Sequence, residues 1–458
     1  MNESAAARSG ALERSPSDVL VLLTLATGFV MAMIDTTAVN VALPDISASL
    51  SVPLNGLVWV VDGYTLTFAA FLIAGGALAD RWGPKSVYQG GLALFLFASL
   101  LCGIAPGGKS LVAARLLQGV GASLFMPSSL SLLAHTYTDD RKRAAMLGLW
   151  SAMVGFAAAT GPLIGGALIH VLGWRSVFWI NVPLGLLGIA LAYLLIPAAP
   201  KQSHPISWVS HAIGALVLAT LSVFLIEGPS LGWHSPIVLA AAVVALIATT
   251  VLVDHERTSS ATLLPRALRR MPGFAAVNLT GFLTNLGAFG QLFLLSLYLQ
   301  GLGSRDPLET GLQLVPTMAT VTVGNFLSSR VSVRFGTRRT MCVGYSIAAA
   351  LGIAILIAGR GTPLRLLVGV SAMNFFVGMA IPAMTTTAMQ IAGRTYANGA
   401  AAALNANRQI GALVGVALMG AIIHSASSWD ARLMIGFATI VSSYAAAALF
   451  VYRFIGRR

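Results

Sequence analysis

The sequence predicts an all-α integral membrane protein with about fourteen membrane-spanning helices. Of its 458 residues, 57% are hydrophobic and only 9% are charged, and the mean hydropathy is +0.82. Soluble domains typically carry about 25% charged residues. Apolar runs also recur along the whole chain, and each is about long enough, at roughly 20 residues, to cross the hydrocarbon core of a bilayer as a helix.

The fourteen apolar runs cover residues 20–43, 54–79, 86–105, 110–133, 144–169, 176–196, 207–226, 235–253, 273–299, 309–332, 339–358, 363–389, 398–424 and 432–454. An even number of spans puts both chain ends on one side of the membrane. Of the 28 Lys and Arg residues, 20 fall on that side when the connecting segments are sorted. Cytoplasmic loops carry the excess of basic residues, so we expect a multi-pass cell-membrane protein, such as one of a bacterial inner membrane, with both termini cytoplasmic.

An internal repeat divides the spans into two halves. Arg81, Gly83 and Lys85 in the loop after the second run have counterparts 253 residues later, after the tenth run. Gly161 and Gly165 in the fifth run have counterparts 250 residues later, in the thirteenth. Such repeats place a substrate site at their interface near mid-membrane. We therefore predict a cytoplasmic tail (1–18), an N-terminal six-helix bundle (19–200), two inserted helices (201–254), a cytoplasmic linker (255–272) and a C-terminal six-helix bundle (273–458).

Five segments carry a family resemblance. They are Ile34–Pro44, Gly76–Lys85, Leu111–Gly121, Gly155–Gly166 and Trp174–Pro183. At these spans and in this order they resemble the signatures of the major facilitator superfamily, and within it of the fourteen-span drug:proton antiporters. The resemblance implies the major facilitator fold, two six-helix bundles plus two inserted central helices, and proton-coupled efflux of amphipathic, cationic drug-like molecules. Its partners would be a small-molecule substrate, protons and the lipid bilayer, with no cofactor, metal, nucleic acid or protein partner.

The loop after the second span is a candidate conformational latch, made of Asp80, Arg81, Gly83 and Lys85. A carboxylate at this position could meet a neighbouring helix N-terminus or an arginine and hold the two halves in one state. The alternative is that these charges only set the topology. Pro84 stands where the family usually has a basic residue, so the loop carries one positive charge fewer.

The fifth span carries the segment that resembles the antiporter motif, with Gly155, Gly161, Pro162, Gly165 and Gly166. Two glycines four residues apart let helix backbones approach closely. Proline removes a helix hydrogen bond and favours a bend. Generic close packing explains this pattern as well as a hinge for antiport does. Only the family resemblance favours proton exchange.

Polar and aromatic stripes suggest the lining of the substrate cavity. The ninth span has two asparagines and two phenylalanines at seven-residue spacing, which puts them along one side of a helix. Hydrogen bonding between helices is the alternative explanation for each polar residue. No acidic residue lies inside a span of the C-terminal half, so that part of the cavity is neutral or positive. The candidate residues are Asn278, Phe282, Asn285, Phe289, Gln313, Thr317, Asn405 and Arg408.

Asp35, Asp62 and Arg115 are charged residues inside spans and are the candidate proton-coupling cluster. Charges in a span cost roughly 2.5 to 3.5 kcal/mol each, so they normally face the bundle interior and pair. Pro44 marks the outer end of the first span, so Asp35 lies about 13 Å inward from it, at a depth similar to the other two. One arginine cannot neutralise two carboxylates, so one carboxylate could take up a proton, and a cationic substrate could compete for the same place. Alternatively, Asp62 faces outside water and Arg115 pairs with Asp35 alone.

Enzymatic and nucleic-acid functions find little support. Residues 103–110 fit the phosphate-loop pattern, but they join two apolar runs instead of following a β-strand. The net charge of +13 is spread over short loops and forms no basic face. Two rivals to drug efflux stay open, namely a dedicated exporter of one metabolite or antibiotic with the same fold, and a membrane sensor or channel.

Overall fold

The computed structural model describes residues 16–198, 201, 207–259, 262–301, 306–358 and 362–456, and within these ranges it is helical without strands. The first group of helices comprises α1 (Pro16–Leu50), α2 (Leu54–Trp82), α3 (Pro84–Gly103), α4 (Gly108–Thr136), α5 (Asp140–Leu172), α6 (Ser176–Trp179) and α7 (Asn181–Leu195). The middle group comprises α8 (Trp208–Leu231), α9 (Pro236–Thr258) and the short α10 (Arg266–Arg269). The last group comprises α11 (Phe274–Gly301), α12 (Pro307–Phe335), α13 (Thr337–Ala358), α14 (Pro363–Ser425) and α15 (Trp429–Phe454).

Each of the fourteen predicted spans is helical. The element α14 contains two of these spans. Gly393 departs from helical geometry at φ +67° and separates Pro363–Gly393 from Thr395–Ser425. Thirteen described helices are long and apolar enough to cross a membrane, and α12 is the span missing from that set. Its 29 residues correspond to about 43 Å of helix. It is therefore long enough to span, and charged and hydroxyl side chains account for its lower hydropathy.

The helix α1 extends further than the sequence suggested. Pro44 was expected at its outer end, but the helix continues through Pro44 to Leu50. Proline removes one backbone hydrogen bond, and the enclosed side chains of Leu43 and Ile46 hold the next turn in place. Asp35 is consequently about 22 Å from the end of the helix, not about 13 Å, and lies close to the middle of α1.

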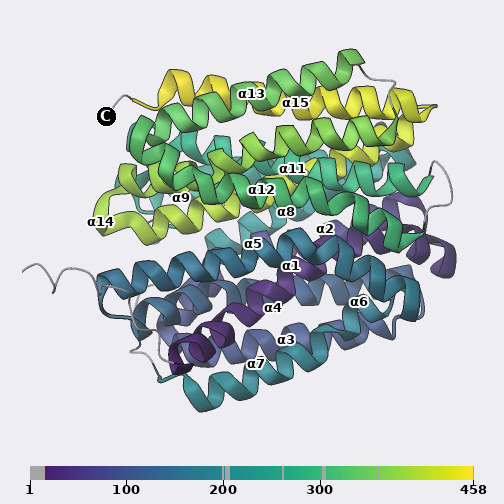
Figure 1. Cartoon of the computed structure of the whole chain (residues 1–458). Helices are drawn as coiled ribbons and strands as arrows, with labels where there is room; N and C mark the ends of the chain where they lie inside the picture. The colour runs from purple at the N-terminus through teal and green to yellow at the C-terminus, as the bar shows by residue number, and fades with distance from the viewer. Residues whose placement is uncertain are drawn as a thin grey trace, which may run out of the picture.

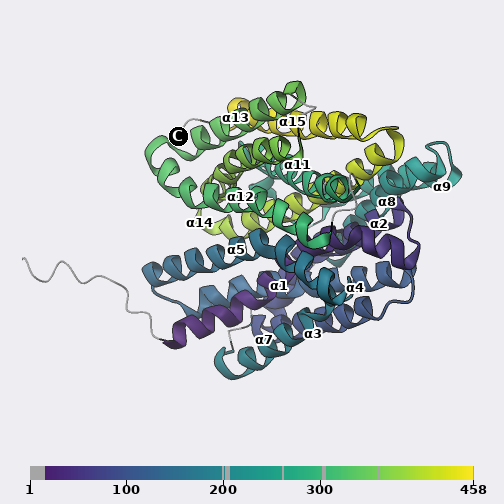
Figure 2. The same ribbon diagram turned by 45° about the vertical axis from the view of Figure 1, so that its right-hand side comes forward.

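The helices form two bundles with α8 and α9 beside them. In Figures 1 and 2, α1 and α3 to α7 lie in the lower half, α11 to α15 lie in the upper half, and α2 lies at the boundary between them. Both described chain ends lie at the left in both views. We call this end of the molecule the terminal face and the opposite end the far face. The helix α8 contacts both α2 and α14, whereas α9 packs on α8 at the edge.

The predicted repeat has matching local structure at the terminal face. Gly83 after α2 and Gly336 after α12 have φ values of +95° and +84°, and each donates its backbone N–H to the carbonyl four residues earlier at 2.9 Å. Lys85 donates to the carbonyl of Tyr193 at 3.0 Å. Likewise Arg338 donates to the carbonyl of Tyr452 at 2.6 Å. In both bundles a basic residue at the start of the third helix therefore ties down the end of the last one.

Candidate proton and substrate sites

A buried ion pair joins the middle of α1 to the first third of α4. Arg115 donates through Nη1 to Oδ2 of Asp35 at 2.5 Å, and the two side chains are 1% and 0% exposed. The other carboxylate oxygen, Oδ1, accepts from Gln118 at 2.9 Å and from Asn181 at 3.2 Å. Asp35 thus has three donors, which is the arrangement that makes a buried carboxylate stable in its ionised form.

Arg115 is held on several sides. Its Nε donates to the carbonyl of Val60 in α2 at 2.9 Å, and its Nη1 also donates to Oε1 of Gln118 at 2.7 Å. The guanidinium lies over the ring of Tyr64, 4.6 Å from the ring centre. The ion pair therefore connects three helices of one bundle, and a movement of α2 acts on it directly through the backbone of Val60.

The sequence interpretation missed two members of this network, Gln118 and Asn181. Both lie in segments used for the family resemblance, and Gln118 is one helical turn after Arg115. That i, i+3 spacing was a usable signal, because two polar residues on one helix face inside a span must share partners. Ser99 completes the network by accepting a hydrogen bond from Gln118 at 2.9 Å.

Asp62 lies outside this network, so the structure pairs two of the three expected residues. Val60 and Tyr64 face Arg115, and Asp62, two residues from each, is on the opposite side of α2. Its neighbours along that side, Trp59 and Leu66, pack against α8 and α14. The carboxyl group is 0% exposed, so it does not face outside water, and neither oxygen has a hydrogen-bond partner among the described residues.

The glycines of the fifth span have two distinct packing partners. Gly161 and Gly165 lie against α1, where a Cβ would overlap the side chains of Thr37 and Ala38 respectively. This contact lies within one bundle. Close approach here fixes α5 to the helix that carries the aspartate of the ion pair.

The other residues of the same motif face α12 in the second bundle. The carbonyl of Gly155 accepts a hydrogen bond from Thr322 at 3.1 Å. A Cβ on Gly166 would overlap the start of α12, and a Cβ on Gly311 would overlap the carbonyl of Pro162. The motif therefore brings the backbones of the two bundles together, toward the far face.

The residues of the candidate latch lie at the terminal face. Asp80 is half-buried in the last turn of α2, Arg81 is exposed, and Gly83 is buried at the helix cap. The Nζ of Lys85 donates to the carbonyl of Tyr193 and also lies 5.6 Å from the centre of the Tyr193 ring. The latching role of this group stays a prediction.

Asn278 and Arg408 contact neighbours from other helices of the second bundle. The Nδ2 of Asn407 donates to Oδ1 of Asn278 at 3.2 Å. The Nε of Arg408 donates to Oδ1 of Asn285 at 3.3 Å. These bonds connect α11 with the second part of α14. Arg408 is half-buried, and Asn285 is 3% exposed.

The remaining cavity candidates are more dispersed. The carbonyl of Thr317 accepts from Asn374, a contact within the second bundle, and Gln313 donates to Glu309 in its own helix at 3.2 Å. Phe282, Phe289 and Asn405 are half-buried. Lining of a substrate cavity stays a prediction for all of them.

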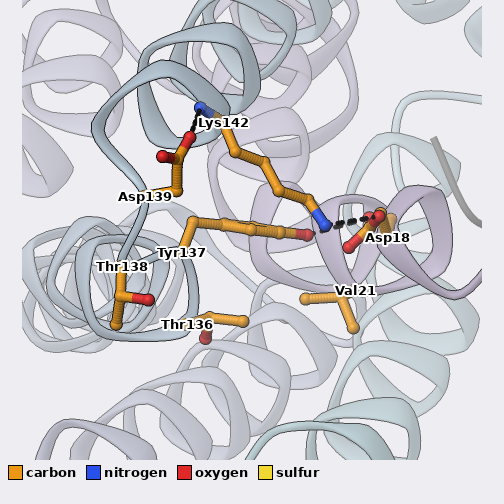
Figure 3. Close-up of a pocket in the computed structure, with 7 residues that line it drawn as sticks. All are labelled: Asp18, Val21, Thr136, Tyr137, Thr138, Asp139 and Lys142. Atoms are coloured by element: carbon orange, nitrogen blue, oxygen red, sulfur yellow. Dashed lines mark hydrogen bonds and ion pairs between the residues drawn. The ribbon is translucent and has the colours of Figure 1, made fainter. Parts of the chain in front are cut away.

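A pocket of about 240 Å³ lies at the terminal face between α1 and the connection from α4 to α5 (Figure 3). Lys142 pairs with Asp18 at 2.9 Å across it, and Tyr137 donates its hydroxyl to the carbonyl of Asp18 at 3.1 Å. Burial, and then the charge of Asp18, raise the pKa of Tyr137 to about 12. The phenol therefore keeps its proton and remains a donor at physiological pH. Its hydrogen bond to the carbonyl of Asp18 thus holds the start of α1 against the end of α4.

A second carboxylate contact ties the inserted helix α8 to α2 near the far face. Glu227 accepts from Trp59 at 2.8 Å and from Asn55 at 3.0 Å. Earlier in α8, toward the terminal face, Leu218 packs in a cluster with Leu66 of α2 and Leu413 of α14. The helix α8 thus covers the line where α2 meets α14.

Two bundles of membrane-length helices, related by a repeat and with charges buried inside the spans, are the arrangement of a membrane transporter. Comparison with known proteins agrees. A family model described as Major Facilitator Superfamily matches residues 25–210 and 206–416 of this chain. The chain belongs to the major facilitator superfamily.

Relatives and solved structures support this assignment. The chain is 46% identical to a methylenomycin A resistance protein of Bacillus subtilis, over 98% of this chain and 97% of that protein. It is 42% identical to a methylenomycin A resistance protein of Streptomyces coelicolor, over 96% and 93% of the two chains. The multidrug resistance protein Stp of Mycobacterium tuberculosis is 31% identical, over 89% and 76%. The inward-open xylose transporter XylE of E. coli has the same fold, with a TM-score of 0.66, 13% identity and coverage of 96% and 97%.

Proposed function

We propose that this chain is a proton-coupled antiporter that exports amphipathic, antibiotic-like molecules from the cytoplasm, with both chain ends in the cytoplasm. The observation that carries the proposal is the carboxyl group of Asp62, which is enclosed without a partner on the side of α2 that packs against the other bundle. Ionisable groups inside membrane spans are costly and typically serve a function.

The bundles meet closely near the far face. Gln300 of α11 donates to the carbonyl of Val41 in α1 at 3.1 Å, and His170 of α5 contacts Asp306 at 2.8 Å. In α14, a Cβ on Gly420 would overlap the Val58 side chain of α2. Asp62 is one helical turn from Val58 and therefore belongs to the same contact. These contacts support a state that is closed toward the outside.

The protonation of Asp62 would decide whether this contact can form. A neutral carboxyl can be enclosed at moderate cost, whereas an ionised one without donors needs water around it. A proton taken up from outside therefore favours closure at the far face. The proton is then lost toward the cytoplasm before the bundles reopen to the outside. Proton entry and substrate exit therefore alternate. Asp35, held ionised by Arg115, would be the fixed charge that senses movement of α2 through Val60.

The names of the relatives guide the substrate class. Resistance to an antibiotic, or to several, is what a drug exporter confers on its cell. A dedicated exporter of one antibiotic is the second candidate, and one observation favours it. The relatives named for a single antibiotic are 46% and 42% identical to this chain, whereas the one named for multidrug resistance is 31% identical.

The test is a transport assay in inverted membrane vesicles with an imposed proton gradient. Methylenomycin A and a panel of dyes are added, and proton release and compound uptake are followed for the wild type and for Asp62→Asn. We expect the wild type to couple the two fluxes and the variant to move compound without proton release. Asp430→Asn, at an exposed position at the start of α15, is the matched control.

Equal proton release by the wild type and Asp62→Asn would overturn the assignment of the proton site. Compound flux that never responds to the gradient would favour the channel or sensor alternative. Uptake of methylenomycin A without any dye would decide for the dedicated exporter.

A further inference from the structure

Two arginines of the described chain lie deep within the spans, and their surroundings are very different. Arg115 is 1% exposed and bonds to Asp35, Gln118 and the carbonyl of Val60. Arg408 is half-buried, and its hydrogen bond to a described residue is that from Nε to Asn285. The first arginine bonds through Nε and Nη1 and has a carboxylate partner, whereas the second bonds through Nε alone and has no carboxylate partner among the described residues.

The Nη groups of Arg408 have no hydrogen-bond partner among the described residues, and they are not fully enclosed. Both oxygens of Asp62, in contrast, are fully enclosed and lack a partner among the described residues. The glycine at position 281 leaves room for the Arg408 side chain, since a Cβ there would lie 3.1 Å from its Cγ. The two Nη groups therefore keep some surface that water can reach.

The second bundle offers this cation no carboxylate. After residue 273 the acidic residues are Asp306, Glu309 and Asp430, which are at the starts of α12 and α15 at the far face. Arg408 is 13 residues beyond Thr395, which puts it about 20 Å along the second part of α14 from the terminal face. Asp35, the pseudo-equivalent of Asn285 at an offset of 250, is already held by Arg115.

The atoms around Arg408 favour an acceptor. Its Nε fixes the orientation of the Asn285 side chain by donating to Oδ1. The Nδ2 of Asn285 then has no acceptor among the described residues, and it is not fully enclosed. Two guanidinium nitrogens and one amide nitrogen thus present donors together. Guanidinium groups bind planar carboxylates through paired hydrogen bonds.

We infer that Arg408, with Asn285, binds a carboxylate on the exported molecule. The substrates are then organic acids with an apolar frame, in contrast to the cationic compounds that the sequence led us to expect. The inference rests on the proposed export function, because it assigns the substrate class of that same transporter. It also explains why an uncompensated cation is kept inside a span, since the substrate supplies the missing charge.

Binding to the purified full-length protein tests this directly. The probes are cyclopentanecarboxylate, benzoate, 2-naphthoate and 9-anthroate, each compared with its primary carboxamide, which has a similar shape and no charge. We expect at least one acid to raise the melting temperature of the wild type while its carboxamide does not. Arg408→Gln should weaken binding of that acid by roughly 10-fold to 100-fold, the range expected for lost charge-assisted hydrogen bonds.

A second variant covers the case in which Arg408→Gln fails to fold. Asn285→Asp keeps the side-chain size and supplies an internal carboxylate next to Arg408, in imitation of the pair formed by Asp35 and Arg115. It should lose acid binding as well. Arg432→Gln, near the far face, is the matched arginine control and should bind the acid like the wild type.

The outcomes separate this inference from the export function. If no acid binds the wild type better than its carboxamide, or if Asn285→Asp binds the acid normally, the carboxylate assignment is wrong. Vesicles that export the bound acid equally well with Arg408→Gln would leave the transporter assignment intact and overturn the carboxylate assignment. Vesicles in which neither acids nor any other compound move would instead contradict export itself.

Discussion

Replacement of Asp35 by asparagine should destabilise the protein as well as stop transport. The carboxylate accepts hydrogen bonds from Arg115 at 2.5 Å, from Gln118 at 2.9 Å and from Asn181 at 3.2 Å. In Asp35→Asn one oxygen becomes an NH₂ group that faces a donor, and Arg115 keeps its charge without a counter-ion. Removing one partner of a buried ion pair costs about 3 to 5 kcal/mol.

The magnitude translates into a measurable change. At a few degrees per kcal/mol, the melting temperature should fall by roughly 5 to 10 °C, and gradient-driven efflux should be lost. Thermal unfolding in detergent and vesicle transport measure the two effects separately. The double variant Asp35→Asn, Arg115→Gln should recover part of the lost stability, because no isolated charge remains. Wild-type transport by Asp35→Asn, or a double variant no more stable than the sum of the single effects, would refute this reasoning.

Three other changes test separate parts of the structure. Asp80→Asn should leave membrane abundance unchanged and slow turnover, and normal efflux rates would contradict the latch. Gly311→Val places a side chain against the carbonyl of Pro162; it should loosen closure at the far face and raise the reactivity of cysteines introduced there, and unchanged labelling would argue against this contact. Phe282→Ala should change which compounds are exported while proton coupling persists, whereas uniform loss together with low abundance would indicate a packing role.

The spans were predictable because they depend on composition over long windows. A run of about 20 apolar residues has few alternatives to a membrane helix, and the family segments fixed their order. The end of α1 was not predictable in the same way. Whether Pro44 ends a helix depends on tertiary contacts of the next turn, such as the enclosed side chain of Ile46, which local sequence does not reveal.

The ion pair was partly predictable from the cost of charge inside a span. That argument says that Asp35 and Arg115 need partners, and they do meet. It gave the wrong result for Asp62, because depth in the membrane was used without helical phase. Asp62 and Val60 differ by about 200° around α2, so they cannot both face Arg115. The partners Gln118 and Asn181 needed three-dimensional information, since amides have many possible acceptors.

The inserted helices break the symmetry between the two lines along which the bundles meet. Where α2 meets α14, α8 packs over both, and Glu227 ties it to the first bundle through Trp59. Where α5 meets α12, contact is made by glycine backbones, and no described helix from the inserted pair lies across them. An amphipathic compound dissolved in the bilayer would thus find one line of contact covered and the other bare. Lateral entry of such a compound between the bundles would consequently be confined to the line between α5 and α12.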